Sequence, residues 1–108
     1  MHTREEIEKK LESNGSLKQY RLEGLDLSGL DFTKANLLGV NIKFCNLSKC
    51  NFTDADMYGA SIMFSDLSSS NMTNTNLKFS NITFSDVSFT DFDNAITDNS
   101  FFSNNKSV

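Results

Sequence analysis

The sequence predicts an all-β fold: a four-sided coil of about four turns with a short helix at its N-terminal end. Three observations lead to this prediction. Every fifth residue from Leu22 is apolar over fifteen consecutive repeats, sequence features recur at a spacing of twenty residues, and residues 1–16 differ in composition from the rest. A repeat of fixed short period indicates a solenoid, in which each repeat stacks on its neighbours.

Residues 1–16 are predicted to form a short capping helix. Thr3 and Glu6 have the spacing of a capping box, in which each side chain bonds the backbone N–H of the other residue. Ile7 and Leu11 lie one helical turn apart among charged residues, and Gly15 suits the left-handed end of a helix. Because so short a helix is unstable alone in water, we expect its apolar stripe to cover the open end of the repeat stack.

Residues 17–104 form the repeat region. Side chains of an extended chain alternate between two sides, so the apolar centre of each repeat and the residue two positions before it are expected to point inward. Asp or Asn stands directly before most centres. The centres are Leu22, Leu27, Phe32, Leu37, Ile42, Leu47, Phe52, Met57, Ile62, Leu67, Met72, Leu77, Ile82, Val87 and Phe92, and Phe102 continues the phase after Thr97.

The five-residue period requires corners. Five is odd, so strict alternation cannot continue between repeats, and one corner per repeat must restore the phase. Phe44, Phe64 and Phe84 recur at a spacing of twenty residues, whereas a spacing of fifteen would place Phe44 with Gly59 and Asn74, which do not match. The sequence therefore indicates four repeats, and four sides, per coil.

The polar repeat positions are predicted to be structural. Short Asp and Asn side chains can bond nearby backbone groups at turns, so these carboxylates are not expected to be catalytic. Cys45 and Cys50 occupy the small inward position on successive sides and are predicted to be buried free thiols, since a disulfide needs Cα atoms within about 7 Å. The same position holds only Ser or Thr between Ser65 and Thr90, so we expect the C-terminal coils to open first.

The C-terminal end is predicted to carry a small plug. Phe101 stands where Asp or Asn is usual, directly before Phe102, and the pair is expected to cover the last coil. Residues 105–108 are assigned to a polar tail, and fraying is expected from Ser103 onward. The alternative is that these last residues form only a disordered tail.

Composition disfavours several classes of function. The 108 residues carry 10 Lys and Arg and 14 Asp and Glu, a net charge of −4, which argues against binding a nucleic-acid backbone. No apolar run has the length of a membrane span and no signal peptide is evident, so we expect a cytoplasmic protein with no membrane partner. The only His, His2, lies in an end expected to be disordered, and no phosphate loop or Cys/His ligand set occurs. We therefore expect no enzyme, metal site, cofactor or small-molecule substrate.

Several quintets carry a family resemblance. ANLLG (35–39), CNLSK (45–49) and ADMYG (55–59) closely resemble the pentapeptide-repeat family, whose consensus is A-(D/N)-L-X-X. The resemblance implies a right-handed, four-sided β-helix. Some members of this family act as DNA mimics that bind DNA gyrase and protect it from quinolones with a long, strongly acidic dimeric rod. This chain is shorter, weakly charged and has Asn in about half of its Asp/Asn positions, so gyrase binding stands as the alternative function.

One surface feature is not required by the repeat pattern. Phe44, Phe64 and Phe84 lie two residues after a centre, at a corner, with Met63 beside them. Stacked aromatic rings on an outer edge favour a protein-interaction edge, used for an unknown protein partner or for self-association. The alternative is that Phe is merely tolerated at corners, where it covers backbone and packs on its neighbours.

Overall fold

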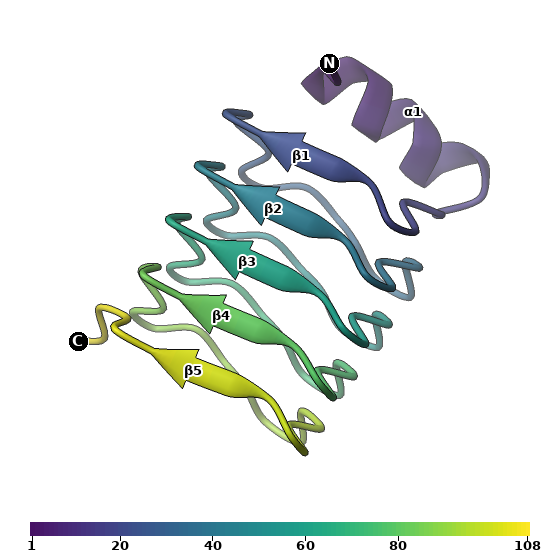
Figure 1. Cartoon of the computed structure of the whole chain (residues 1–108). Coiled ribbons are helices and arrows are strands. Elements are labelled where there is room, and N and C mark those ends of the chain that lie inside the picture. The colour runs from purple at the N-terminus through teal and green to yellow at the C-terminus, as the bar shows by residue number, and fades with distance from the viewer.

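The computed structural model describes all 108 residues and contains one helix and five short parallel strands (Figure 1). Each strand pairs with the strand twenty residues further on, so that Leu22 lies opposite Ile42 and Ile62 opposite Ile82. The predicted β-helix of about four coils, with four repeats per coil and a short N-terminal helix, is confirmed. Its elements are α1 (Arg4–Ser13), β1 (Arg21–Glu23), β2 (Asn41–Lys43), β3 (Ser61–Met63), β4 (Asn81–Thr83) and β5 (Phe101–Ser103).

The other three sides of the coil are joined by isolated parallel bridges at the same spacing. The first bridge joins Ser16 to Asn36 and the last joins Asp86 to Lys106. The Lys106 N–H donates to the Ser85 carbonyl at 2.8 Å, and the Asn105 side chain donates to the Ile82 carbonyl at 2.9 Å. The predicted polar tail over 105–108 is therefore wrong for its first two residues, because both are hydrogen-bonded into the coil.

Every repeat turns a corner through one left-handed residue. From Gln19 to Asn104, each fifth residue has a φ between 51° and 73°, as the odd period requires. Most of these residues are not glycine, and a left-handed conformation costs an ordinary residue about 1–2 kcal/mol. Because this strain recurs around the whole coil, a left-handed Phe at one corner is not in itself a sign of function.

The Asp and Asn residues before the centres close the turns on three of the four sides. Each side-chain Oδ1 accepts the backbone N–H two residues later, as at Asp31, whose partner is the Thr33 N–H at 2.9 Å. Hydrogen bonds from the Ser or Thr two residues later, first from its hydroxyl and then from its backbone N–H, lower the pKa of Asp26 and Asp31. The predicted structural role is confirmed on these sides. On the strand side, Asn41 and Asn81 form no such bond.

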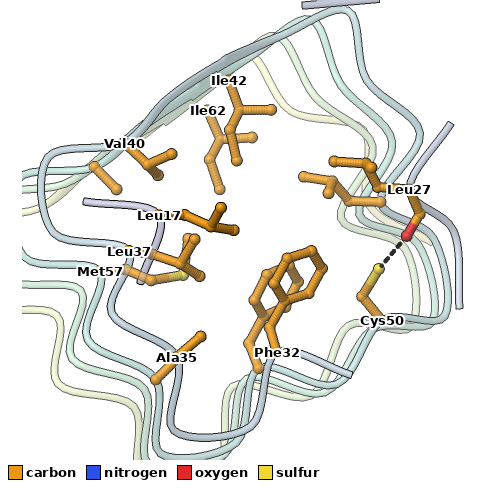
Figure 2. Close-up of a cluster of buried hydrophobic side chains, with 14 of the residues drawn as sticks. Leu17, Leu27, Phe32, Ala35, Leu37, Val40, Ile42, Cys50, Met57 and Ile62 are labelled. Atoms are coloured by element: carbon orange, nitrogen blue, oxygen red, sulfur yellow. Dashed lines mark hydrogen bonds between the residues drawn. The ribbon is translucent and has the colours of Figure 1, made fainter. Parts of the chain in front are cut away.

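The core is a set of stacked columns. Leu27, Leu47 and Leu67 are all fully buried, and the rings of Phe32 and Phe52 stack at 4.8 Å between centroids (Figure 2). Where the small inward position becomes polar, three hydroxyls donate to backbone carbonyls one coil before, those of Ser70, Thr75 and Thr90. Ser70 Oγ, for example, donates to the Leu47 carbonyl at 2.7 Å. The hydroxyls of Ser65 and Ser85 donate to a carbonyl two residues before, and the Ser80 hydroxyl has no partner.

Helix α1 covers the N-terminal end of the coil, as predicted (Figure 1). Ile7 is fully buried, and Leu11 packs against the core at its margin. Arg4 adds a polar link, because its Nη1 donates to the carbonyls of Asp26 and Ser28 at 3.1 and 3.0 Å. Those carbonyls belong to the first coil and have no earlier coil to bond, so Arg4 satisfies two groups that would otherwise be free.

His2 is more ordered than predicted. Its ring stacks on Tyr20, with 4.6 Å between centroids and 15° between planes, and its Nδ1 contacts the carboxylate of Glu6. Sequence spacing does not predict the Tyr20 contact, because that ring reaches the helix only after the chain has turned into the first coil.

The C-terminal end is less covered than predicted. Phe101 does not plug it: the side chain points outward from β5 and is 60% exposed, because it flanks the centre on the side where no Asp or Asn is needed for the turn. Only Phe102 lies over the end, edge-on to Phe92 at 5.6 Å, and it is still 38% exposed.

Hydrogen exchange should therefore show that the C-terminal coils open first. Of the centres from Val87 onward, Val87 and Phe92 are partly buried and Thr97 and Phe102 are exposed, whereas the centres of the middle coils are fully buried. We expect backbone amides of 86–104 to exchange faster than those of 42–62, measured residue by residue by NMR. Equal protection in the two halves would contradict the prediction.

Candidate functional site

The phenylalanines at 44, 64 and 84 form a continuous aromatic ladder on one outer edge. Adjacent ring centroids are 5.2 Å apart, and the planes differ by only 10° and 14°. Phe44, Phe64 and Phe84 are 58%, 46% and 50% exposed, respectively. The spacing follows the coil-to-coil distance of about 4.8 Å, so the fold itself holds the rings in register.

Backbone geometry explains why these rings project outward. Each Phe follows directly after a strand of the β2–β4 series and is left-handed, which carries the chain around a corner to the next side. Met63 lies one residue before that corner on β3, between Lys43 and Thr83 in the neighbouring strands, and is partly exposed. The structure thus stacks the three rings that the sequence suggested for the interaction edge, whereas Met63 adjoins them only through its chain neighbour Phe64.

A shallow, open groove runs beside the aromatic ladder. Its other wall carries the turn residues of the next side, among them the carboxylates of Asp66 and Asp86. All four ion pairs of the chain involve the helix or the residues next to it, so neither carboxylate has a basic side chain within 4 Å. The groove is lined by Phe44, Cys45, Asn46, Phe64, Ser65, Asp66, Phe84, Ser85, Asp86, Asn104 and Lys106.

The neighbouring corners also expose aromatic rings, but they form no ladder. Phe79 is 54% exposed and tilts against Tyr58, with 5.4 Å between centroids, while Phe89 is 73% exposed and stacks on no ring. Each has a non-aromatic residue one coil before it, Gly59 and Ser69 respectively. The edge at 44, 64 and 84 is therefore the one corner with three consecutive rings.

The acidic wall of the groove is the part of the site that the sequence interpretation missed. Asp66 and Asp86 lie two residues after Phe64 and Phe84, and the same spacing joins Phe44 to Asn46. This repeated Phe-x-Asx spacing was a usable signal. The spacing by itself predicts turn formation, which accounts for Oδ1 of both aspartates, and it does not show that they share an edge with the rings.

Both cysteines are free and buried, as predicted. Cys45 forms part of the groove wall, whereas Cys50 lies in the core, where its thiol donates to the Leu27 carbonyl at 3.1 Å (Figure 2). Removal from water disfavours the thiolate, so burial raises the pKa of both thiols, that of Cys50 to about 11. Neither thiol is activated as a nucleophile at neutral pH.

The Cys50 thiol is expected to make the fold sensitive to alkali. Its pKa is raised in the folded state, so the stability it contributes is complete below about pH 9 and is lost as the pH rises toward 11. The loss should reach at most about 2–3 kcal/mol. Urea unfolding at pH 8 and pH 10.5 measures it, and Cys50→Ala is the control, since Ala fills equivalent inward positions. Equal losses in both proteins would contradict this assignment.

The structure contains no candidate metal centre. No three His, Cys, Asp or Glu side chains converge as they would around a metal ion. The single helix is too short and too polar to cross a membrane.

Comparison with protein families gives one match. The model for pentapeptide repeats matches eight copies over residues 35–74 and 60–96, which is more than half of the chain. A comparison with curated protein sequences gave no match.

Three solved structures illustrate the likeness in fold. A pentapeptide repeat protein of the Arabidopsis thaliana thylakoid lumen is 27% identical (TM-score 0.63) over 80% of this chain and 61% of that chain. HetL, involved in heterocyst differentiation regulation in the cyanobacterium Nostoc, is 17% identical (TM-score 0.66) over 80% of this chain and 46% of HetL. A trypsin-treated form of the plasmid-mediated fluoroquinolone resistance protein QnrB1 is 18% identical (TM-score 0.55) over 76% of this chain and 50% of the QnrB1 chain. The chain spans less than two thirds of the length of each.

Proposed function

Since the chain belongs to the pentapeptide repeat family, we propose that it is a non-enzymatic scaffold that binds another protein through the aromatic ladder of Phe44, Phe64 and Phe84. The single observation that carries this proposal is the stack of three half-exposed rings on one edge. Contiguous apolar surface of this kind on a small protein marks an interaction site.

The energetics of the isolated chain do not account for the ladder. A large apolar side chain that is fully buried stabilises a fold by about 1.5–3 kcal/mol relative to an exposed one, and these rings forgo about half of that. Stacking between neighbouring rings returns about 0.5–1.5 kcal/mol per pair. Polar residues and glycine occupy most other corners, so the turn itself does not need a ring. A partner that covers the ladder would recover the missing burial.

The substitution Phe64→Asp tests this proposal at the centre of the ladder. We expect the variant to fold, because the ring is exposed and other corners carry Asp, as at Asp54. Partners captured by cross-linking in cells should be lost. Phe89→Asp is the matched control, since it places the same charge at a corner outside the ladder, and it should leave capture intact. Unchanged partners and unchanged light scattering with Phe64→Asp would remove the ladder from any binding role.

Gyrase binding is the second candidate and has weaker support. The likeness to QnrB1 concerns the fold alone at 18% identity. Double-stranded DNA carries about one charge per 1.7 Å, or roughly three per coil height, whereas residues 17–108 hold only 10 acidic and 7 basic side chains in total. We expect no inhibition or quinolone protection of DNA gyrase in a supercoiling assay at micromolar protein. Either effect would favour the DNA-mimic function instead.

A further inference from the structure

We propose that the groove beside the aromatic ladder takes an arginine-bearing segment of the protein partner. This inference rests on the proposed function, since it names the chemistry of the partner for the same edge. The groove joins two features that single corners of the fold do not combine: three stacked rings on one wall and unpaired carboxylates on the other.

The two walls match the two parts of an arginine side chain. The ladder offers an apolar surface for the methylene stem, while the carboxylates of Asp66 and Asp86 lie one coil apart, about 4.8 Å, and can each receive a guanidinium. Their turn hydrogen bonds use only Oδ1, at 2.8 Å from the Ser68 N–H and 2.9 Å from the Ser88 N–H. Oδ2 of both residues is left to accept from a partner.

The top of the ladder offers a second contact for a guanidinium. The column continues from Phe44 to Gly24, which has no side chain, and a Cβ built there would meet nothing within 4 Å. Phe44 is accordingly the most exposed of the three rings. A planar guanidinium stacks on an aromatic face and pairs with carboxylates through two parallel N–H donors, which an ammonium group cannot do. Arginine therefore fits this edge better than lysine.

The charge of the chain favours a basic partner over a second copy of the same chain. The net charge is −4, and residues 61–108 hold five acidic side chains against Lys78 and Lys106. Lys106 lies at the far end of the groove and forms no ion pair with Asp86, whose Oδ1 accepts from the Ser88 N–H. The groove is thus complementary to a basic segment and poorly matched to another copy of an acidic chain.

The test uses two short probes and the whole chain. Acetyl-Leu-Arg-Leu-Arg-Leu-amide and its Glu counterpart are titrated separately into labelled protein and followed by NMR. We expect the Arg peptide to shift the signals of Phe64, Asp66 and Phe84, and the Glu peptide to shift none. Added salt should weaken binding of the Arg peptide, because salt screens carboxylates that lie near the surface.

Matched Asp→Asn variants make the result specific. Asp66→Asn keeps the turn hydrogen bond, as Asn46 does one coil before. It should lower the affinity for the Arg peptide about three- to fivefold. Asp91→Asn removes the same charge from an equivalent turn on another side and should leave affinity unchanged. Equal weakening by both variants, equal binding of the Glu peptide, or no binding of the Arg peptide to the unmodified chain would overturn the proposal.

The same variants separate this inference from the proposed function. If Phe64→Asp abolishes partner capture but Asp66→Asn does not change it, the ladder binds proteins and the arginine assignment fails. If Phe64→Asp leaves every partner and the Arg-peptide shifts unchanged, the ladder itself has no binding role and both proposals fail.

Discussion

Replacing Phe52 with alanine is expected to lower the free energy of unfolding by about 3–5 kcal/mol. The ring is fully buried in a middle coil and stacks on Phe32 at 4.8 Å between centroids. Its removal leaves a cavity that the neighbouring coils cannot close, because backbone hydrogen bonds fix their spacing on every side. Since a domain of this size is stable by only about 5–15 kcal/mol, urea unfolding should show a large shift of the midpoint.

Phe64→Ala is the control for this prediction. The residue type and the change are the same, but the ring is 46% exposed and its loss leaves no internal cavity. We expect a smaller loss of about 1–3 kcal/mol, because the ring stacks on both Phe44 and Phe84. If Phe64→Ala were as destabilising as Phe52→Ala, the ladder would be a structural element, as the alternative interpretation of the sequence holds, and the case for a docking edge would be weakened.

The fold was predictable because one physical requirement repeats along the chain. A period of five with an inward centre allows only a coil with a corner in every repeat, and the corner is visible as a left-handed residue at every fifth position. The recurrence of Phe44, Phe64 and Phe84 then gave the number of sides, since side chains one coil apart stack directly. The cap by Ile7 followed from a short helix that cannot bury its stripe alone.

The errors arose where one side of the coil differs from the other three. The strand side turns without the Asp or Asn hydrogen bond, so Phe101 is tolerated there and points outward instead of plugging the end. Asn105 belongs to the coil because its side-chain amide takes the place of the inward Ser. Its Oδ1 accepts from the Ser85 N–H at 2.9 Å. A sequence pattern averaged over all repeats does not distinguish the sides, and so missed both residues.

The candidate site was predicted only in part for a related reason. The outward position of the rings follows from their place after a centre, and the structure confirms that geometry. Whether the adjacent turn residues share a groove with them depends on the corner angle, which the spacing of residues does not specify. The sequence therefore does not place Asp66 and Asp86 beside the rings, although they line the same groove.

Ile7→Ala is expected to destabilise the N-terminal end by about 2–5 kcal/mol. Ile7 packs over the first coil and is the one buried residue of α1. A ten-residue helix that loses this contact is too short to persist in water, so the helix should melt and expose Leu17 and Leu22. Circular dichroism at 222 nm and exchange of the Leu27 and Phe32 amides would report the change.

Lys9→Ala provides the matched control on the same helix. The Lys9 ammonium lies 3.4 Å from the Glu5 carboxylate, both side chains are exposed, and such a surface pair contributes at most about 0.5 kcal/mol. A helix that melts in both variants would show that α1 depends on its own side-chain pairs. A helix that melts only with Ile7→Ala would show that burial of Ile7 on the coil holds the helix in place. Stability unchanged by Ile7→Ala would mean that the first coil does not need the helix as a cap.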